Sequence, residues 1–342
     1  NDTTGTAFTD MIGAPTSIGN DASAAMGSDI GDVDNDGDWD LYMTDIPNEG
    51  AAPLGNVLYL GDGSGGFTDN SCDVAGICTS ANTWPCNFAD FDQDGWVDLW
   101  VGSTRPGEDD FVFRNIGDGT FSSVPQAEMK GNKARGGSVA DYDGDGDVDI
   151  MFWNSEQNSL LYRNEGDQSK HWLGVKLLGT TSNRDAIGAL VRVTSGGQTQ
   201  MRRVSGGDSA HSQRELILNF GLGESTLVDS LQVDWPSGLV ETFTKLTTDE
   251  LLFLEEGSGV LAETITELAA TWSMADQVVC IEIRSSFGGR TAFDIPALGP
   301  LPWSSSTLSF ANLFPGVTSN PGTVSINSRR GVTYQVTVTT IP

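Results

Sequence analysis

Short apolar runs, many of them alternating with polar residues, recur along the whole chain and predict β-strands. In the first half they occupy 41–45, 99–103 and 150–154. Further on, the runs LVRVTS, LILNF, SLQVDW and LVETF span 190–195, 216–220, 230–235 and 239–243. Glycine-rich turns separate the runs, and 42 glycines in 342 residues suit short strands better than long helices. The pattern predicts an all-β fold.

One acidic segment occurs three times without gaps, and it precedes each strand of the first half. It reads DVDNDGDWD at 32–40, DFDQDGWVD at 90–98 and DYDGDGDVD at 141–149, so the shared pattern is D-x-D-x-D-G-x-x-D. Positions two and eight are always apolar, whereas position seven varies. An EF-hand loop would need an acid at position twelve, where Met43, Val101 and Phe152 stand instead. We therefore expect loops between strands, not between helices.

The residue types of this segment suit a hard cation. Calcium takes six to eight oxygen ligands, and alternate Asp residues at positions one, three and five can converge on one ion. The glycine at position six allows a turn at positive φ, and the Asp at position nine closes the shell. Position seven varies freely, as expected where the main-chain oxygen meets the ion. An acidic turn without an ion is the alternative, but three copies in register favour calcium.

A hairpin-like stretch follows each acidic segment, at 56–69, 110–123 and 158–172, which gives a repeat of 50–60 residues and about four strands. These repeats resemble FG-GAP/VCBS-type repeats, the calcium-bearing blades of integrin-like β-propellers, over roughly 5–165. The resemblance implies one structural calcium ion per loop. The implied ligands are Asp32, Asp34, Asp36, Asp38 and Asp40, then Asp90, Asp92, Asp94, Trp96 and Asp98, then Asp141, Asp143, Asp145, Asp147 and Asp149, with only the main-chain oxygen acting at Asp38, Trp96 and Asp147.

Three blades are fewer than the four to eight that usually close a propeller. The third repeat lacks an outermost strand, and GTAFTD at 5–10 resembles the outermost strand at 65–69. The N-terminus would then complete blade three or a blade of a neighbouring molecule. In either case the partial propeller has open sides, which the later domains or another chain must cover. Other subunits, joined through open β edges, are therefore predicted partners.

Two further β domains follow the repeats. The signatures DAIGALVRV, SGG, FGLG and VDWPSG within about 170–256 resemble the ASPIC/UnbV domain, which accompanies such repeats in secreted proteins of the cartilage acidic protein type. Beyond it, 278–286, 323–328 and 332–340 read as strands, and 260–272 reads as either a helix or a strand. This last domain is a stability or sorting module, or an assembly device that uses its final strand. The predicted domains are 1–168, 169–257 and 258–342.

Composition and cysteines favour an extracellular protein. Eighteen Lys and Arg against 47 Asp and Glu give a net charge of −29, which makes nucleic acid and anionic membranes poor partners. No apolar run approaches a membrane span, and an N-terminal Asn1 is compatible with removal of a signal peptide. We expect one disulfide within 72–86 and an oxidising compartment. The four cysteines are Cys72, Cys78, Cys86 and Cys280.

Concentrated chemistry other than ion binding is not found in the sequence. His171 and His211 are the only histidines, no set of His and Cys residues clusters suitably for zinc, and P-loop and dinucleotide motifs are absent. A Ser-His-Asp arrangement of Ser205 or Ser209, Asp208 and His211 is possible on paper, but we expect this loop to be solvated. The leading hypothesis is a secreted, non-enzymatic, calcium-binding structural or adhesion protein, with a subunit of an extracellular surface filament as one form of that role. The alternatives are a glycan-binding module that uses Trp39, Trp96, Trp100 and Trp153, or a polysaccharide hydrolase.

Overall fold

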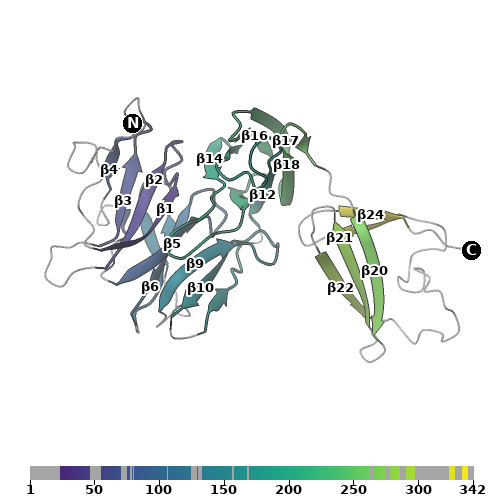
Figure 1. Cartoon of the computed structure of the whole chain (residues 1–342), viewed down its shortest axis with the longest axis horizontal. Coiled ribbons are helices and arrows are strands. Elements are labelled where there is room, and N and C mark those ends of the chain that lie inside the picture. The colour runs from purple at the N-terminus through teal and green to yellow at the C-terminus, as the bar shows by residue number, and fades with distance from the viewer. Residues whose placement is uncertain are drawn as a thin grey trace, which may run out of the picture. The chain divides into compact units, whose positions relative to one another are not determined.

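The computed structural model of this chain shows an all-β protein (Figure 1). It describes residues 24–46, 55–70, 75–77, 79, 81–105, 107–124, 129, 133–155, 158–167 and 169–261, and the backbone alone of the strands at 265–273, 278–285, 290–296, 323–327 and 333–337. The chain forms two compact units, Asn1–Gly259 and Val260–Pro342, each described by itself. Among the described residues, no helix is long and apolar enough to cross a bilayer.

Three small antiparallel sheets follow one another in the first unit, and we call them blades one, two and three. Blade one has the strand order β1-β2-β3-β4, blade two β5-β6-β7-β8, and blade three β11-β10-β9. Their strands are β1 Ala25–Gly31, β2 Asp40–Asp45, β3 Val57–Gly61, β4 Phe67–Asp69, β5 Thr83–Ala89, β6 Asp98–Ser103, β7 Phe111–Asn115, β8 Phe121–Val124, β9 Ala134–Ala140, β10 Asp149–Asn154 and β11 Leu160–Tyr162. As predicted, blade three lacks an outermost strand among the described residues.

The blades pack through one face of their second strands. Tyr42 of β2 and Trp100 of β6 are fully buried, and they meet the rings of Phe88 and Phe152 at centroid distances of 6.1 and 5.6 Å. Met151 stands at the equivalent position of blade three, two residues after the last loop Asp, yet it is 54% exposed. Its neighbours Trp153 and Leu161 are 51% and 49% exposed. The outer face of blade three therefore exposes apolar residues where blades one and two bury theirs.

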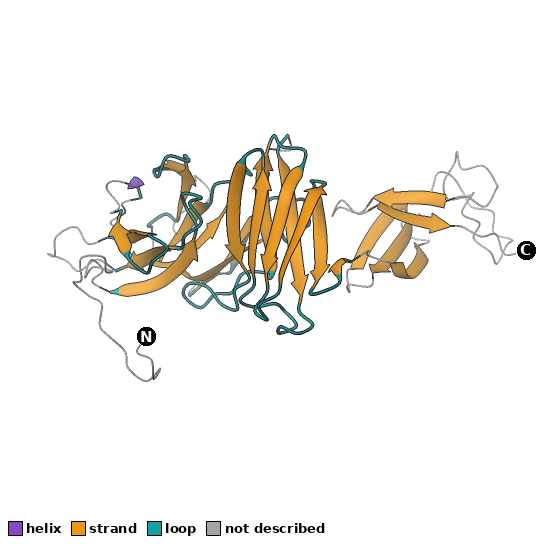
Figure 2. Ribbon diagram, turned by 90° about the horizontal axis from the view of Figure 1, so that it is seen from above, coloured by secondary structure: helices purple, strands orange, loops and turns teal. Residues whose placement is uncertain are grey.

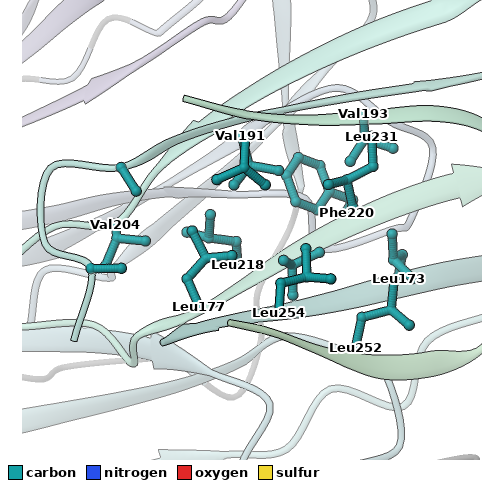
Figure 3. Close-up of a cluster of buried hydrophobic side chains, with 14 of the residues drawn as sticks. Leu173, Leu177, Val191, Val193, Val204, Leu218, Phe220, Leu231, Leu252 and Leu254 are labelled. Carbon is teal, nitrogen blue, oxygen red and sulfur yellow. The ribbon is translucent and has the colours of Figure 1, made fainter. Parts of the chain in front are cut away.

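A β-sandwich completes the first unit. One sheet has the order β15-β12-β18-β19 and the other β14-β13-β16-β17. Alternating side chains of both sheets meet in an apolar core that contains Leu173, Val191, Phe220, Leu231 and Leu254 (Figure 3). The strands are β12 His171–Leu178, β13 Leu190–Ser195, β14 Gln198–Arg203, β15 Ile217–Gly223, β16 Val228–Asp234, β17 Val240–Leu246, β18 Glu250–Glu255 and β19 Gly259–Val260. The four runs expected here are strands.

The second unit contains a three-stranded sheet, β20-β21-β22, and a hairpin, β23-β24, which Figure 2 shows in orange. Their bounds are β20 Ile265–Ser273, β21 Val278–Ser285, β22 Arg290–Pro296, β23 Thr323–Asn327 and β24 Thr333–Thr337. The ambiguous run at 260–272 is a strand from Ile265 onward. The N-terminal segment 5–10 lies outside the described residues, and the bounds given above for the three domains stay predictions.

Candidate metal centre

Each acidic segment forms the loop between the first two strands of its blade, and the three loops share one conformation. The glycines at position six, Gly37, Gly95 and Gly146, have φ values of 91°, 91° and 95°, a region that other residues rarely adopt. Position four is also left-handed, with φ of 54° at Asn35 and 57° at Gln93. Asn tolerates this region better than most residues. The loop therefore turns back on itself twice within three residues.

The first and last carboxylates of each loop hold its backbone in this shape. The Gly37 N–H donates to Asp32 Oδ2 at 3.2 Å, and the matching bonds of loops two and three measure 2.8 and 3.0 Å. At position nine, Asp98 accepts from the Phe91 N–H at 2.9 Å and from the Asn115 N–H of β7 at 2.8 Å. The same two bonds occur at Asp40 and Asp149. Position nine thus joins the loop to the next hairpin.

The loops bring their remaining carboxylates together. Three groups have ligand atoms within 4.8 Å of one another: Asp32, Asp34 and Asp36; Asp90, Asp92 and Asp94; and Asp141, Asp143 and Asp149. Asp40, Asp98 and Asp145 are ligands predicted from the sequence that stand outside these groups. At an effective dielectric constant near 20, two charges 4.8 Å apart repel by roughly 3 kcal/mol. Each group needs positive charge to be stable in its ionised form.

Side chains at position seven take no part in these groups. Asp38, Trp96 and Asp147 each lie against a glycine in the following turn, so close that a Cβ added to Gly63, Gly117 or Gly166 would overlap them. This placement leaves the main-chain carbonyl of position seven as the group it can offer to an ion. It also gives a physical reason why this position accepts both Asp and Trp.

Burial changes the acidity of several loop carboxyls. It is the largest cause in each case, and neighbouring loop carboxylates add to it because like charges disfavour ionisation. The pKa rises to about 6 for Asp32, about 7 for Asp40, about 7 for Asp90, about 8 for Asp98 and about 6 for Asp149. Raised pKa values in a repeated motif mark carboxylates that lack the positive charge their surroundings require.

One buried carboxylate oxygen in each loop has no hydrogen-bond partner. In loop one it is Oδ1 of Asp32, a residue only 1% exposed; in loops two and three it is Oδ1 of Asp92 and of Asp143. A buried oxygen without a donor is costly, and native proteins rarely leave one. Three such oxygens, each inside a ring of carboxylates, fit the all-oxygen shell of Ca²⁺. Calcium bound there would supply the missing positive charge.

Neighbouring loops are connected by side-chain amides. Asn35 at position four donates to the Gly95 carbonyl of loop two at 3.1 Å, and Gln93 donates to the Gly146 carbonyl of loop three at 2.9 Å. A second contact runs backwards, since Asn115 donates to the Val33 carbonyl at 2.7 Å. Asn164 makes the matching bond to the Phe91 carbonyl at 2.7 Å. At the two ends of the row, the equivalent positions are Gly61 and Gly144, which have no side chain.

The β-sandwich also contacts the loops directly. Gln198 of β14 donates to the Gly95 carbonyl at 3.2 Å, and the Gly223 N–H donates to the Gln93 carbonyl at 2.8 Å. The Trp172 ring lies so close to Gly146 that a Cβ built there would overlap it. The second loop is therefore bonded both to the third loop and to the sandwich, and the third loop packs against the sandwich. The sequence carried a signal for the links between loops, namely amides in equivalent positions of the repeat, but not for those to the sandwich.

Residues 207–215, the plug segment, leave the sandwich and contact the innermost strand of every blade. The Ser209 N–H donates to the Ser28 carbonyl at 3.0 Å, the Cys86 N–H donates to Ser209 Oγ at 2.8 Å, and Ser212 Oγ donates to the Gly137 carbonyl. The expectation of a solvated loop holds only in part, because Gly207, His211 and Gln213 are exposed and the rest of the segment is half-buried. Its polar groups find partners on strands more than 70 residues away, which local sequence cannot reveal.

The plug segment is fixed by a buried ion pair. The Arg214 guanidinium contacts both Asp29 of β1, which is 4% exposed, and Asp208, with 2.8 Å between Nε and Asp208 Oδ2. Burial alone would lower the pKa of Arg214, but the charges of Asp29 and Asp208 raise it above its ordinary value. A cavity of about 480 Å³ beside the segment is lined by charged and apolar side chains, among them Arg202 and Leu218.

These contacts also determine whether the Ser-His-Asp arrangement considered in the sequence can form. Asp208 is paired with Arg214, and the His211 ring stacks on Trp84 with 6.2 Å between centroids. Ser209 Oγ accepts from the Cys86 backbone. Ser205 Oγ donates to the Gly207 carbonyl at 2.7 Å. The side chains that were neighbours in sequence therefore have separate partners and do not form a triad.

The remaining candidates separate into buried and exposed residues. Trp100 is fully buried in the blade packing, whereas Trp153 is half exposed. Cys86 is a free, buried cysteine, and the side chains of Cys72, Cys78 and Cys280 lie outside the described residues. The predicted disulfide within 72–86 stays a prediction, with Cys86 not a member of a pair in this structure.

Comparison with known proteins assigns both parts of the first unit. Residues 32–101 and 90–152 match the FG-GAP-like repeat, and residues 179–260 match the ASPIC and UnbV domain. Cartilage acidic protein 1 of Mus musculus is 29% identical over 162 residues, which are 44% of this chain and 25% of that protein. The Xenopus tropicalis protein is 31% identical over 114 residues, 32% of this chain and 17% of that protein. The chain spans a quarter or less of these relatives.

Proposed function

The chain joins FG-GAP-like repeats to an ASPIC and UnbV domain, and we propose that it is an extracellular structural protein whose blades are held by three calcium ions. The proposal includes no catalytic role. Its main support is the unpartnered buried Oδ1 atom in each loop, on Asp32, Asp92 and Asp143. Similarity to cartilage acidic protein 1 supports the extracellular setting, as does the net charge of −29.

Calcium would act as a structural ion. Bound to the unpartnered carboxylate oxygens of a loop, calcium neutralises the carboxylates and fixes the connection between the first two strands of a blade. Three ions cancel about six negative charges. With the affinity of extracellular modules, the dissociation constants are on the order of 10⁻⁴–10⁻³ M, so millimolar calcium would occupy most sites.

Thermal unfolding with and without calcium tests this proposal. In millimolar calcium we expect a higher melting temperature than in excess EGTA, because an ion that binds only the folded loops stabilises them by mass action. Magnesium at the same concentration is the control, since it prefers a smaller octahedral shell with several waters. Identical melting curves in calcium and EGTA would contradict the proposal.

We further propose that the chain assembles with other subunits through the exposed face of blade three. Met151, Trp153 and Leu161 occupy positions whose counterparts in blades one and two are covered by the next blade. Negative-stain electron microscopy in calcium and then in EGTA tests the filament role. Ordered polymers that Trp153→Ser or EGTA disperses would support it, and isolated particles in both buffers would contradict it.

Glycan binding is the second candidate function, and the half-exposed Trp153 favours it. An exposed indole can stack on a sugar ring through its apolar face. A glycan array read by tryptophan fluorescence separates this role from assembly. Quenching that disappears in Trp153→Ser, with no change in particle size, would favour the glycan role.

A further inference from the structure

Leu60, Arg114 and Arg163 occupy the same place in the three blades, but only two of them are cations. Strand registers fix the equivalence. Leu41 pairs with Tyr59, Leu99 with Phe113 and Ile150 with Tyr162, and the residues that follow in the third strands are Leu60, Arg114 and Arg163. The chemical difference between the blades therefore lies at one structural position, next to otherwise matching acidic loops.

Both arginines form the same ion pairs with the acidic loop of their blade. In blade two, Arg114 contacts Asp92 Oδ2 through Nε at 2.5 Å and Asp94 Oδ2 through Nη2 at 3.1 Å. In blade three, Arg163 contacts Asp143 Oδ2 and Asp145 Oδ2, each at 3.0 Å. The guanidinium thus bridges positions three and five through their outer oxygens. Its fork matches two carboxylates better than a lysine would.

The contacts leave the inner oxygens available to an ion. Oδ1 of Asp92 and Oδ1 of Asp143 are buried without a partner, on the opposite side of each carboxylate from the bonded Oδ2. Each arginine therefore does not occupy the ion position itself. It places a permanent positive charge behind two of the carboxylates that would bind the ion.

Loop one has no such cation. Five Asp residues lie within 32–40, and among the described residues none of them forms an ion pair. Asp32 is 1% exposed and its Oδ1 has no partner. The Arg202 guanidinium lies near enough to act on both Asp32 and Asp90, but it bonds to Gln200 and the Met201 carbonyl. Because Arg202 is shared, it does not distinguish site one from site two.

We propose that Arg114 and Arg163 are built-in counter-cations that rank the three ion sites. Site one, beside Leu60, binds calcium most tightly and depends on it most for its shape. Sites two and three bind more weakly, because the guanidinium repels the incoming ion, and they depend on the ion less for their shape, because the guanidinium already offsets part of the carboxylate repulsion. The inference rests on the proposed calcium-binding function. The expected difference in affinity is on the order of tenfold.

Calcium titration of the full chain by calorimetry tests the ranking, with Tb³⁺ luminescence as a second probe. Trp39 and Trp96 within loops one and two, and Trp172 against loop three, can sensitise bound Tb³⁺. Variants that remove the negative charge at position three assign each binding step to a site. They are Asp34→Asn, Asp92→Asn and Asp143→Asn. We expect Asp34→Asn to eliminate the tightest step.

A second set of variants exchanges arginine and leucine at the equivalent position of the three blades. Arg114→Leu and Arg163→Leu should each tighten calcium binding about tenfold at their own site and lower the melting temperature in EGTA. Arg184→Leu, which removes one exposed positive charge elsewhere, is the control. The reciprocal change Leu60→Arg should weaken the tightest step about tenfold. Leu60→Gln controls for the loss of apolar packing, since Leu60 also packs against the core.

The outcomes separate this inference from the function on which it rests. If neither Ca²⁺ nor Tb³⁺ binds the wild-type chain, the proposed function fails. If three ions bind with equal constants that the exchanges leave unchanged, only the ranking fails. Weaker binding in Arg114→Leu would also overturn it, because the arginine would then act by positioning the ligands. Leu60→Arg gives an answer even where an arginine variant does not fold.

Discussion

Two buried carboxylates show how differently the blades and the sandwich are stabilised. Glu256 of the sandwich accepts bonds from the Thr180, Thr181 and Ser182 N–H groups and from the Ser182 and Ser237 hydroxyls. These donors lower its pKa to about 2. Asp32 of blade one is as deeply buried, but its Oδ1 has no donor and burial raises its pKa to about 6. The protein itself supplies the hydrogen-bond donors that the Glu256 carboxylate needs, whereas Oδ1 of Asp32 has no donor.

The difference extends to the cores. The sandwich encloses a continuous apolar cluster that includes Leu177, Val193, Phe220 and Leu252 (Figure 3). The blades bury apolar residues too, but they also bury loop carboxylates such as Asp40 and Asp98, at 1% and 2% exposure. Burial of apolar surface needs no external partner, whereas a buried charge needs a counter-charge. The blades should therefore respond to ions and the sandwich should not.

Removal of calcium should have the largest effect, and it should destabilise the blades but not the sandwich. For a dissociation constant near 10⁻⁴ M and 2 mM calcium, linkage gives roughly 2 kcal/mol per site and about 5 kcal/mol for three sites. Hydrogen exchange in EGTA should speed up in β1–β11, most strongly in blade one, and stay unchanged in the core strands β12, β13 and β16. Equal acceleration in both regions would contradict the comparison.

Breaking the buried ion pair of the plug segment should weaken the contact between the two regions. Arg214→Met leaves the carboxylates of Asp29 and Asp208 buried without their partner, which typically costs about 3–5 kcal/mol. Hydrogen exchange should speed up in β1, β5 and in 207–215, with or without calcium. Exposed Arg184→Met is the control. Protection of β1 equal to that of wild type would show that the pair does not hold the segment.

Loss of the charge at Glu256 should affect the sandwich alone. Glu256→Gln weakens charge-assisted bonds and places an amide N–H₂ against donors, at a cost of about 1–3 kcal/mol. Because the folded-state pKa is lowered, wild-type stability from this group is present above pH 4.5 and declines as pH falls toward 2. Denaturant unfolding of the variant should show less dependence on pH in that window. Glu224→Gln, at an exposed position, is the control.

Removing one link between loops should give the smallest effect. Asn35→Gly keeps the left-handed backbone but deletes the bond to the Gly95 carbonyl, worth about 1 kcal/mol. Calcium titration should show reduced cooperativity between sites one and two. Gly144→Asn is the matched control, because among the described residues no loop follows loop three. A titration curve identical to wild type would mean that the sites bind independently.

Much of this architecture could be predicted from the sequence because it depends on local residue patterns. The period of the acidic loops, the apolar runs around them and the glycine at position six predicted the three loops and the strands that follow, and the sandwich strands were expected from alternation. The pairing of Arg114 with Asp92 and Asp94 was not predicted, although an alignment of the repeats places arginine in two blades and Leu60 in the third.

Contacts over long sequence separation could not be found in this way. Arg214 and Asp29 are 185 residues apart, and only the fold brings them together. The plug segment is polar and rich in serine and glycine, so local composition indicates a solvated loop. Whether such a segment bonds to another domain depends on which backbone groups that domain presents to it, and that information is absent from a single sequence.

The central claim is that the blades bind three calcium ions, and counting bound calcium tests it most directly. Equilibrium dialysis in millimolar calcium, followed by elemental analysis, should give three ions per chain for wild type and none for the combined variant Asp32→Ala, Asp90→Ala and Asp141→Ala. The control variant, Asp62→Ala, Asp118→Ala and Asp167→Ala, removes three turn carboxylates whose partners are local Ser and Thr residues. It should keep three ions. Wild-type protein without bound calcium would contradict the account.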